Sequence, residues 1–153
     1  MKVLRKLITV LIMTVLFILA GCSNEEVIQE SLIYKGENES WRAEYKVDSK
    51  ITTTTKDNII NKYEGKKSDL LTVTYKKDLS QLASVKHLKI TYNSSCSGGS
   101  LEDEFDKNNP IDKKTFKIQG VSGGVEVEKK DEIVKVNINV DGKIQTIELK
   151  SIN

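Results

Sequence analysis

From Trp41 onward, apolar and polar residues alternate with a period of two along much of the chain. This period is typical of β-strands that place one face on a core and the other in water. Such alternation covers 41–48, 71–76, 88–92, 116–118 and 125–128. The pattern is weaker from Ile51 to Tyr63, but Thr52 to Thr55 favour a strand because they are branched at Cβ. Leu79 to Val85 has helical spacing and predicts about two turns of helix.

The C-terminal region predicts a β-hairpin around Asp141-Gly142, which lies between two alternating runs. A two-residue turn there pairs Val140 with Lys143 and fixes the register of the whole hairpin. One side then carries the apolar pairs Val134–Leu149 and Val136–Ile147 together with Ile138–Gln145. The other side carries Lys135–Glu148, Asn137–Thr146 and Asn139–Ile144. One register therefore aligns most apolar positions and one pair of opposite charges.

These short strands, joined by Gly, Asn and Asp turns, predict an all-β domain over residues 32–153. Two architectures fit: a single antiparallel β-sandwich of immunoglobulin-like type, or a small barrel. The single Trp41 suits the core of a sandwich, although the Cys–Trp–Cys arrangement of antibody domains is absent.

The first 21 residues predict a cleaved signal helix that precedes this domain. Lys2, Arg5 and Lys6 are followed by a run without charge from Leu7 to Leu19. A basic segment, a short apolar segment and small residues at the end are the parts of a secretory signal. The uncharged run up to Cys22 is short for a membrane span, which takes about 20 apolar residues.

Leu19-Ala20-Gly21-Cys22 resembles the lipobox of bacterial lipoproteins. The resemblance implies cleavage between Gly21 and Cys22 and a diacylglyceryl group on the Cys22 sulfur. Two acyl chains give a stable anchor, whereas one chain binds a membrane only marginally. The expected organisation is a lipoprotein signal peptide (1–21), a lipidated tether (22–31) and the β-domain, held at the extracytoplasmic face of the cell membrane.

The segment from Gly36 to Tyr45 resembles a segment of small uncharacterised lipoproteins of Bacillus-type bacteria (Firmicutes). In that family a Gly-Glu pair leads through polar residues to a Trp, with a Tyr four positions later. Ser40 precedes Trp41 in this chain, where the family usually has Glu-Ser-Glu-Asn-Trp. The resemblance implies an anchored β-domain and carries no reaction, cofactor or catalytic residue.

Charge and cysteine content narrow the classes of partner. Three of the 24 basic residues lie in the signal peptide, so 21 remain against 22 acidic residues in the mature chain. A nearly neutral domain lacks the basic surface that nucleic acid requires. With Cys22 acylated, Cys96 is the one remaining cysteine and cannot form an internal disulfide.

Candidate chemistry is sparse. Cys96 and the single histidine, His87, are a conceivable nucleophile and base, but a solvated strand histidine is the favoured interpretation. The glycine-rich loop from Asn93 to Ser100 lacks the Lys-Ser/Thr of a phosphate loop and is expected to be a flexible connection. Weak candidates for calcium ligands lie in an acidic stretch without EF-hand spacing: Glu102, Asp103, Glu104 and Asp106.

Trp41 and Tyr45 share one strand face and would suit either stacking on a sugar or a place in the core, and the core is favoured. The sequence thus predicts a non-enzymatic binding or structural module of the cell envelope without a cofactor. Its expected partners are the lipid bilayer, through diacylglyceryl-Cys22, and an envelope protein or cell-wall component. Two alternatives remain: a small envelope enzyme using Cys96 and His87, and a calcium-stabilised structural domain.

Overall fold

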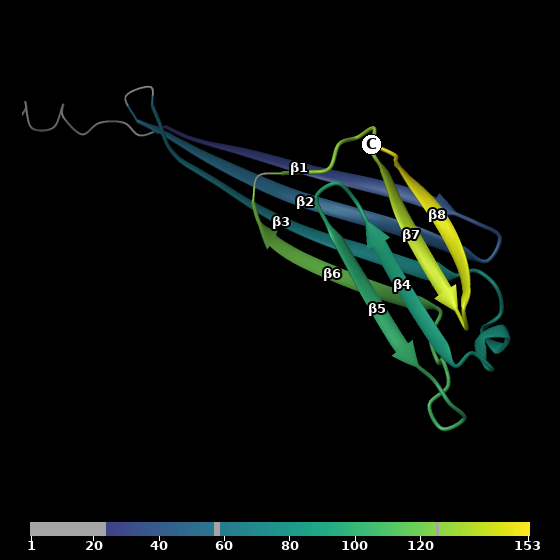
Figure 1. Cartoon of the computed structure of the whole chain (residues 1–153). Coiled ribbons are helices and arrows are strands. Elements are labelled where there is room, and N and C mark those ends of the chain that lie inside the picture. The colour runs from purple at the N-terminus through teal and green to yellow at the C-terminus, as the bar shows by residue number, and fades with distance from the viewer. Residues whose placement is uncertain (1–23, 57–58, 125) are drawn as a thin grey trace, which may run out of the picture. The chain divides into compact units, whose positions relative to one another are not determined.

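The computed structural model describes residues 24–56, 59–124 and 126–153. The predicted signal helix and the lipobox with its cleavage site at Gly21 and Cys22 lie outside these residues. The described chain forms eight strands and one short 3₁₀ helix (Figure 1). In chain order they are β1 (Asn24–Glu37), β2 (Trp41–Lys56), β3 (Ile59–Tyr75), η1 (Leu79–Leu82), β4 (His87–Asn93), β5 (Gly98–Glu104), β6 (Thr115–Gly123), β7 (Ile133–Val140) and β8 (Lys143–Ser151).

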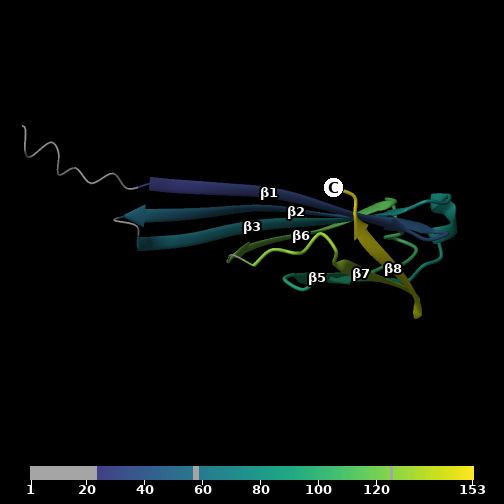
Figure 2. The ribbon, with the colours of Figure 1, turned by 90° about the horizontal axis from the view of Figure 1, so that it is seen from above.

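The eight strands form one sheet in the order β5-β4-β7-β8-β1-β2-β3-β6. The sheet is antiparallel and nearly closed like a barrel. Figure 2 shows β1, β2 and β3 side by side, with β5 and β7 across from them. The two end strands approach each other at Gly99 of β5, where an added Cβ would lie 3.0 Å from Cγ2 of Ile118 in β6. The all-β prediction is confirmed, and of the two predicted architectures the protein adopts the small barrel.

The chain divides into two compact units. One contains the described residues 24–27, 52–56 and 59–63. The other contains the described residues 28–51, 64–124 and 126–153 and holds the barrel core.

The barrel core follows the predicted alternation. On β2, Trp41, Ala43, Tyr45 and Val47 are all buried, and corresponding residues of β3, β4 and β7 face the same interior. The Trp41 ring lies 4.8 Å from Tyr75 and 6.2 Å from Phe116, measured between ring centroids. Such tilted aromatic pairs add to the stabilisation from burial. Trp41 and Tyr45 are therefore core residues, which are not available for stacking on a sugar.

The C-terminal hairpin has the register predicted from the sequence. Val140 pairs with Lys143, and every predicted pair from there to Val134–Leu149 is present. Asp141 and Gly142 have φ values of 48° and 86°, as a tight turn with two left-handed residues requires. Ile144 lies on the polar side and is 66% exposed.

The structure differs from the prediction at the proposed tether. Strand β1 begins at Asn24, so residues 24–31 are strand and not an irregular linker. In the sheet β1 lies between β8 and β2, and the polar composition of residues 24–31 does not indicate these strand neighbours. A polar segment can still form a strand when a neighbouring strand is available, because strand formation depends on its context in the sheet.

Two further predictions need correction. The segment from Leu79 to Val85 forms only the short helix η1, whose first turn is capped by Asp78 accepting a hydrogen bond from the Ser80 N–H. Of the predicted strand 125–128, the described residues 126–128 lie outside any strand; Glu128 is buried in the barrel interior, and Val127 is only partly buried. No helix in the described part of the chain is long and apolar enough to span a bilayer.

Candidate functional site

The barrel interior changes from apolar to polar along β2, β3 and β4. Beyond the aromatic packing around Trp41, the next inward positions are Tyr45 on β2, Asp69 and Lys67 on β3 and Tyr92 on β4. Loops add three side chains, Ser94, Ser97 and Glu128, which bond to these residues. We refer to the seven residues Tyr45, Lys67, Asp69, Tyr92, Ser94, Ser97 and Glu128 as the polar cluster.

Asp69 is the centre of one half of the polar cluster. Its carboxylate accepts hydrogen bonds from the hydroxyl groups of Tyr45 (3.3 Å), Tyr92 (3.2 Å) and Ser97. The rings of Tyr45 and Tyr92 lie 5.1 Å apart between centroids, so they present their hydroxyl groups to the same acceptor. Asp69 is buried, and these three donors replace the water that its charge would otherwise need.

Glu128 is the centre of the other half. Its side chain accepts from Lys67 Nζ at 3.3 Å, from the Tyr45 hydroxyl at 2.9 Å and from the Ser94 hydroxyl at 2.8 Å. Lys67 Nζ also donates to the backbone carbonyl of Cys96 at 2.9 Å. The Lys67–Glu128 ion pair is almost completely removed from solvent. Among the described residues, no buried side-chain polar atom lacks a hydrogen-bond partner.

This arrangement fixes loops to the barrel wall. Ser94, Cys96 and Ser97 belong to the connection between β4 and β5, and Glu128 belongs to the connection between β6 and β7. Lys67 and Asp69 bind both connections from β3. Tyr34 of β1 adds a further bond, from its hydroxyl to the Lys129 carbonyl at 2.8 Å. Lys67, Asp69 and Glu128 are buried and Ser94 and Ser97 are partly buried, so the polar cluster joins the two connections to the interior side of β3.

Burial also changes the acidity of the tyrosines here. The loss of solvation raises the pKa of Tyr34 to about 12, and the carboxylates of Glu132 and Glu128 act in the same direction. The pKa values of Tyr45 and Tyr92 are raised as well, first by burial and then by nearby carboxylates. A phenolate is disfavoured in this environment because it would be poorly solvated and would face negative charge.

The raised pKa values predict a loss of stability at high pH. An unfolded tyrosine loses its proton near pH 10. The fold keeps Tyr34, Tyr45 and Tyr92 neutral. Their contribution to the free energy of unfolding is therefore complete below about pH 10, and it is lost as the pH rises towards their pKa values in the folded protein. Absorbance at 295 nm and circular dichroism, recorded together, should show that the ionisation of Tyr34, Tyr45 and Tyr92 accompanies the loss of the fold. Ionisation of all five tyrosines with the circular dichroism unchanged would contradict this.

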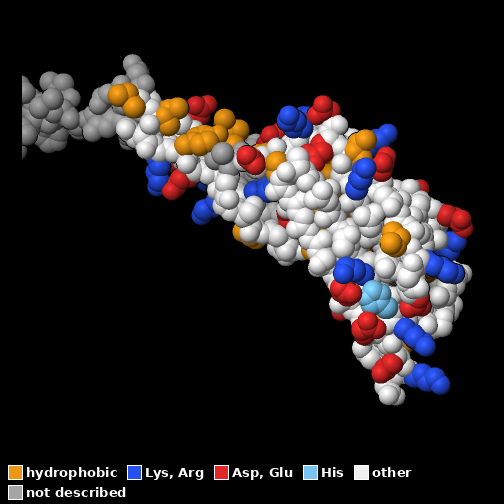
Figure 3. All heavy atoms as spheres, in the orientation of Figure 1, with side chains coloured by type: hydrophobic (Ala, Val, Ile, Leu, Met, Phe, Trp, Pro, Cys, Tyr) orange, Lys and Arg blue, Asp and Glu red, His pale blue; other side chains and the backbone are white. Residues whose placement is uncertain are grey.

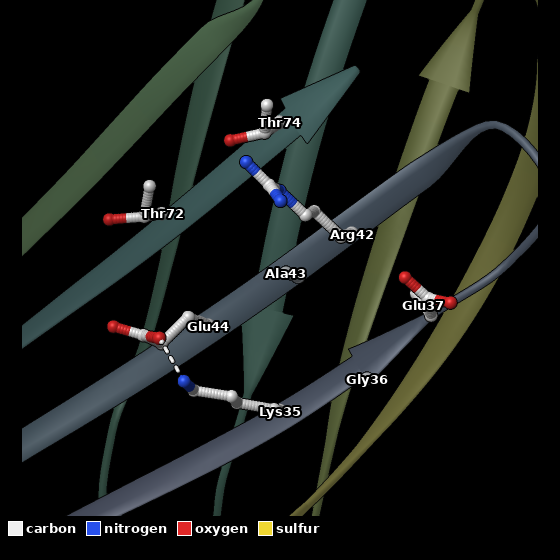
Figure 4. A pocket seen from close by; sticks show the side chains of 8 residues that line it. All are labelled: Lys35, Gly36, Glu37, Arg42, Ala43, Glu44, Thr72 and Thr74. Carbon is white, nitrogen blue, oxygen red and sulfur yellow. Dashed lines mark ion pairs between the residues drawn. The ribbon is translucent and has the colours of Figure 1, made fainter. Parts of the chain in front are cut away.

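A groove lies on the outer face of β1, β2 and β3 (Figure 4). It is lined by Lys35, Gly36, Glu37, Arg42, Ala43, Glu44, Thr72 and Thr74. Lys35 and Glu44 form an ion pair of 2.9 Å, and Glu37 pairs with Lys76 at 3.2 Å. Arg42 reaches towards Thr72 and Thr74 on the next strand. Among the charged groove residues, which the structure describes in full, Arg42 alone has no ion pair or hydrogen bond from its side chain.

The structure separates the two residues of the predicted nucleophile–base pair. His87 begins β4 and Cys96 follows its end, so the length of a seven-residue strand, about 20 Å, lies between them. His87 Nε2 is 2.9 Å from Oε1 of Glu102, and Cys96 Sγ is 3.3 Å from the Ser95 hydroxyl. Cys96 contributes its backbone carbonyl, and not its thiol, to the polar cluster.

The predicted acidic ligands also point in different directions. Glu102 binds Lys89 at 2.8 Å in addition to His87, and the hydrogen bond from Lys89 is the main reason that its pKa is lowered. Asp103 lies on the opposite face of β5 from Glu102 and Glu104. Asp106 accepts from the backbone N–H groups of Asn108 and Asn109. Within the described ranges, no three His, Cys, Asp or Glu side chains gather as metal ligands would.

The polar cluster was missed by the sequence analysis, although part of it left a signal. Lys67 and Asp69 continue the alternation of Leu71, Val73 and Tyr75 towards the start of β3, so their parity places them inside. The burial of Glu128 could not be predicted in this way, because the alternation around it places Val127 inside and Glu128 on the solvent face.

Comparisons with protein family models, curated proteins and solved structures found no match to this chain.

Proposed function

We propose that this protein is a lipoprotein anchored by diacylglyceryl-Cys22 at the extracytoplasmic face of the cell membrane, and that its barrel is a non-enzymatic binding module. The observation that carries the proposal is Leu19-Ala20-Gly21-Cys22, placed directly after the uncharged run from Leu7 to Leu19. The thiol supplies the nucleophile for a thioether, and two acyl chains hold a protein at a membrane stably.

Two structural observations support a binding rather than a catalytic role. In the described part of the chain, every buried side-chain polar atom has a hydrogen-bond partner, and Tyr45, Asp69, Tyr92 and Glu128 are bonded within the polar cluster. The two candidates for chemistry, His87 and Cys96, are partly buried, and they lie at the start of β4 and beyond its end. Their separation exceeds the hydrogen-bond distance that a nucleophile and its base require.

The location can be tested with a lysine reagent that does not cross membranes. Applied to intact cells of the native host after removal of the wall, it should label the protein, because many lysines of the barrel are exposed. A cytoplasmic control protein should stay unlabelled until the cells are lysed. If this protein were labelled only after lysis, the proposed location would be wrong.

The groove of Figure 4 is the proposed contact for an acidic envelope component. The other charged residues of the groove are paired, so Arg42 is the group available to an external anion. Its guanidinium can bind a carboxylate or phosphate through two parallel hydrogen bonds. The hydroxyl group of Thr74, which also lies 3.3 Å from the Thr115 hydroxyl, is close to the guanidinium.

Replacing Arg42 with glutamine is expected to weaken binding to cell-wall material from the native host about tenfold, the effect of losing one charge-assisted contact. Co-sedimentation with purified walls measures the bound fraction. Lys143→Gln removes the same charge from the exposed start of β8 and is the matched control. Equal losses in both variants would mean that general charge, and not the groove, governs binding.

A further inference from the structure

The smaller unit of the chain exposes several large apolar side chains. Val27 is 45% exposed, Ile59 65%, Ile60 64% and Tyr63 55%. All four belong to the described residues 24–27, 52–56 and 59–63, which we call the strand tip. Figure 3 shows hydrophobic side chains gathered over this part of β1 and β3. An apolar concentration of this kind on a small unit marks a surface that contacts something else.

The apolar side chains lie on both faces of the strand tip. Ile59 and Tyr63 share one face of β3, because they are an even number of positions apart, and Ile60 lies on the other face. A flat protein partner covers one face of a ribbon only. A medium that surrounds the ribbon covers both, which favours the lipid layer over a docked protein.

The chain length places the strand tip beside the proposed anchor. Cys22 precedes Asn24 by two residues and Val27 by five. Five extended residues span at most about 17 Å. In the antiparallel sheet, the start of β1, the end of β2 and the start of β3 lie at the same end of the ribbon. An acyl group on Cys22 would therefore hold Ile59 and Ile60 close to the lipid headgroups as well.

The side chains of the strand tip suit the headgroup layer rather than the hydrocarbon. Tyrosine is enriched at membrane interfaces, where its ring is in contact with lipid and its hydroxyl with water. Glu25, Glu26 and Asn61 are exposed in the same unit and would be costly at hydrocarbon depth. The edge of a three-stranded ribbon also needs water for its backbone groups, and the interface provides it.

We propose that the strand tip is immersed in the headgroup layer of the membrane, as a second contact beside the lipid on Cys22. This inference rests on the proposed anchoring and adds to it the part of the fold that contacts lipid. The apolar residues on both faces and the short link to Cys22 are the observations that carry it.

The test uses the full-length acylated protein in vesicles whose lipids carry bromine, which quenches tryptophan fluorescence at short range. Three variants, Tyr63→Trp, Ile60→Trp and Ile144→Trp, each add one probe to the buried Trp41 that all share. Ile144→Trp is the matched control, since Ile144 is exposed to a similar degree but lies at the start of β8 in the other unit.

Brominated lipid should reduce the added emission at positions 60 and 63 at least twofold and leave that at position 144 unchanged. Flotation of the same samples reports anchoring separately. A protein that floats while both probes stay unquenched would overturn the strand-tip contact and leave the anchor standing. Quenching at only one of positions 60 and 63 would overturn the immersion of both faces. An added emission that changes with the amount of protein per vesicle, and not with bromination of the lipid, would indicate that a second copy of the protein covers the strand tip, and would also overturn immersion. A protein that does not float would overturn both proposals.

Discussion

Replacing Lys67 with methionine is expected to lower the free energy of unfolding by about 3–5 kcal/mol, the cost of leaving a buried charge without its partner. Lys67 is 5% exposed and supplies the ammonium group of the polar cluster. Without it, the carboxylates of Glu128 and Asp69 are buried with hydroxyl donors alone. The Cys96 carbonyl also loses its donor, which removes one of the hydrogen bonds that hold the connection between β4 and β5 to the barrel wall.

Urea unfolding followed by Trp41 fluorescence measures this effect, because Trp41 is buried within the same barrel. Lys66→Met is the matched control: it makes the same chemical change one position away, where the side chain is exposed. We expect it to alter stability by less than about 0.5 kcal/mol. A loss below about 1 kcal/mol for Lys67→Met would show that the buried pair contributes little.

A double variant separates the loss of charge balance from the loss of packing. Lys67→Met with Glu128→Gln removes both charges and keeps an acceptor for the hydroxyl groups of Tyr45 and Ser94. Replacement of both members of a buried pair is often close to neutral. The double variant should therefore recover at least about half of the stability lost in Lys67→Met. A further loss instead would place the stabilisation in contacts other than the ion pair.

Replacing Cys22 with alanine is expected to abolish incorporation of labelled palmitate in the native host. Alanine has no sulfur to receive the diacylglyceryl group, so the loss should be complete and not partial. The signal peptide should also be retained, which leaves a precursor longer by 21 residues that is visible as a shift on a denaturing gel.

Cys96→Ser is the control for Cys22→Ala, because it removes the one other cysteine of the chain. Its label and mobility should match those of the wild type. If Cys96→Ser lost the palmitate label, or if Cys22→Ala were fully labelled, Cys22 would not be the acylated residue.

The elements that the sequence predicted well are those fixed by local pattern. The hairpin around Asp141-Gly142 follows from turn chemistry and from a register that a shift of one residue would invert. The core side of β2 follows from strict alternation between Trp41 and Val47. In both cases residues near one another in the chain contain the information.

The features that could not be predicted depend on contacts between distant segments. The choice of barrel over sandwich rests on the approach of Gly99 in β5 to Ile118 in β6, which no local pattern encodes. Glu128 is buried with an ion-pair partner, Lys67, which is 61 positions away in the chain and contacts it inside the barrel. An isolated acidic residue in a polar loop normally stays in water, so its burial becomes apparent only with its partner.

The central claim is that Cys22 is the acylated first residue of the mature protein. Mass spectrometry of the intact protein from its native host tests this most directly. The account predicts a chain that begins at Cys22 and carries the mass of a diacylglyceryl group on that residue. A chain that begins at Met1, with an unmodified thiol at position 22, would contradict it.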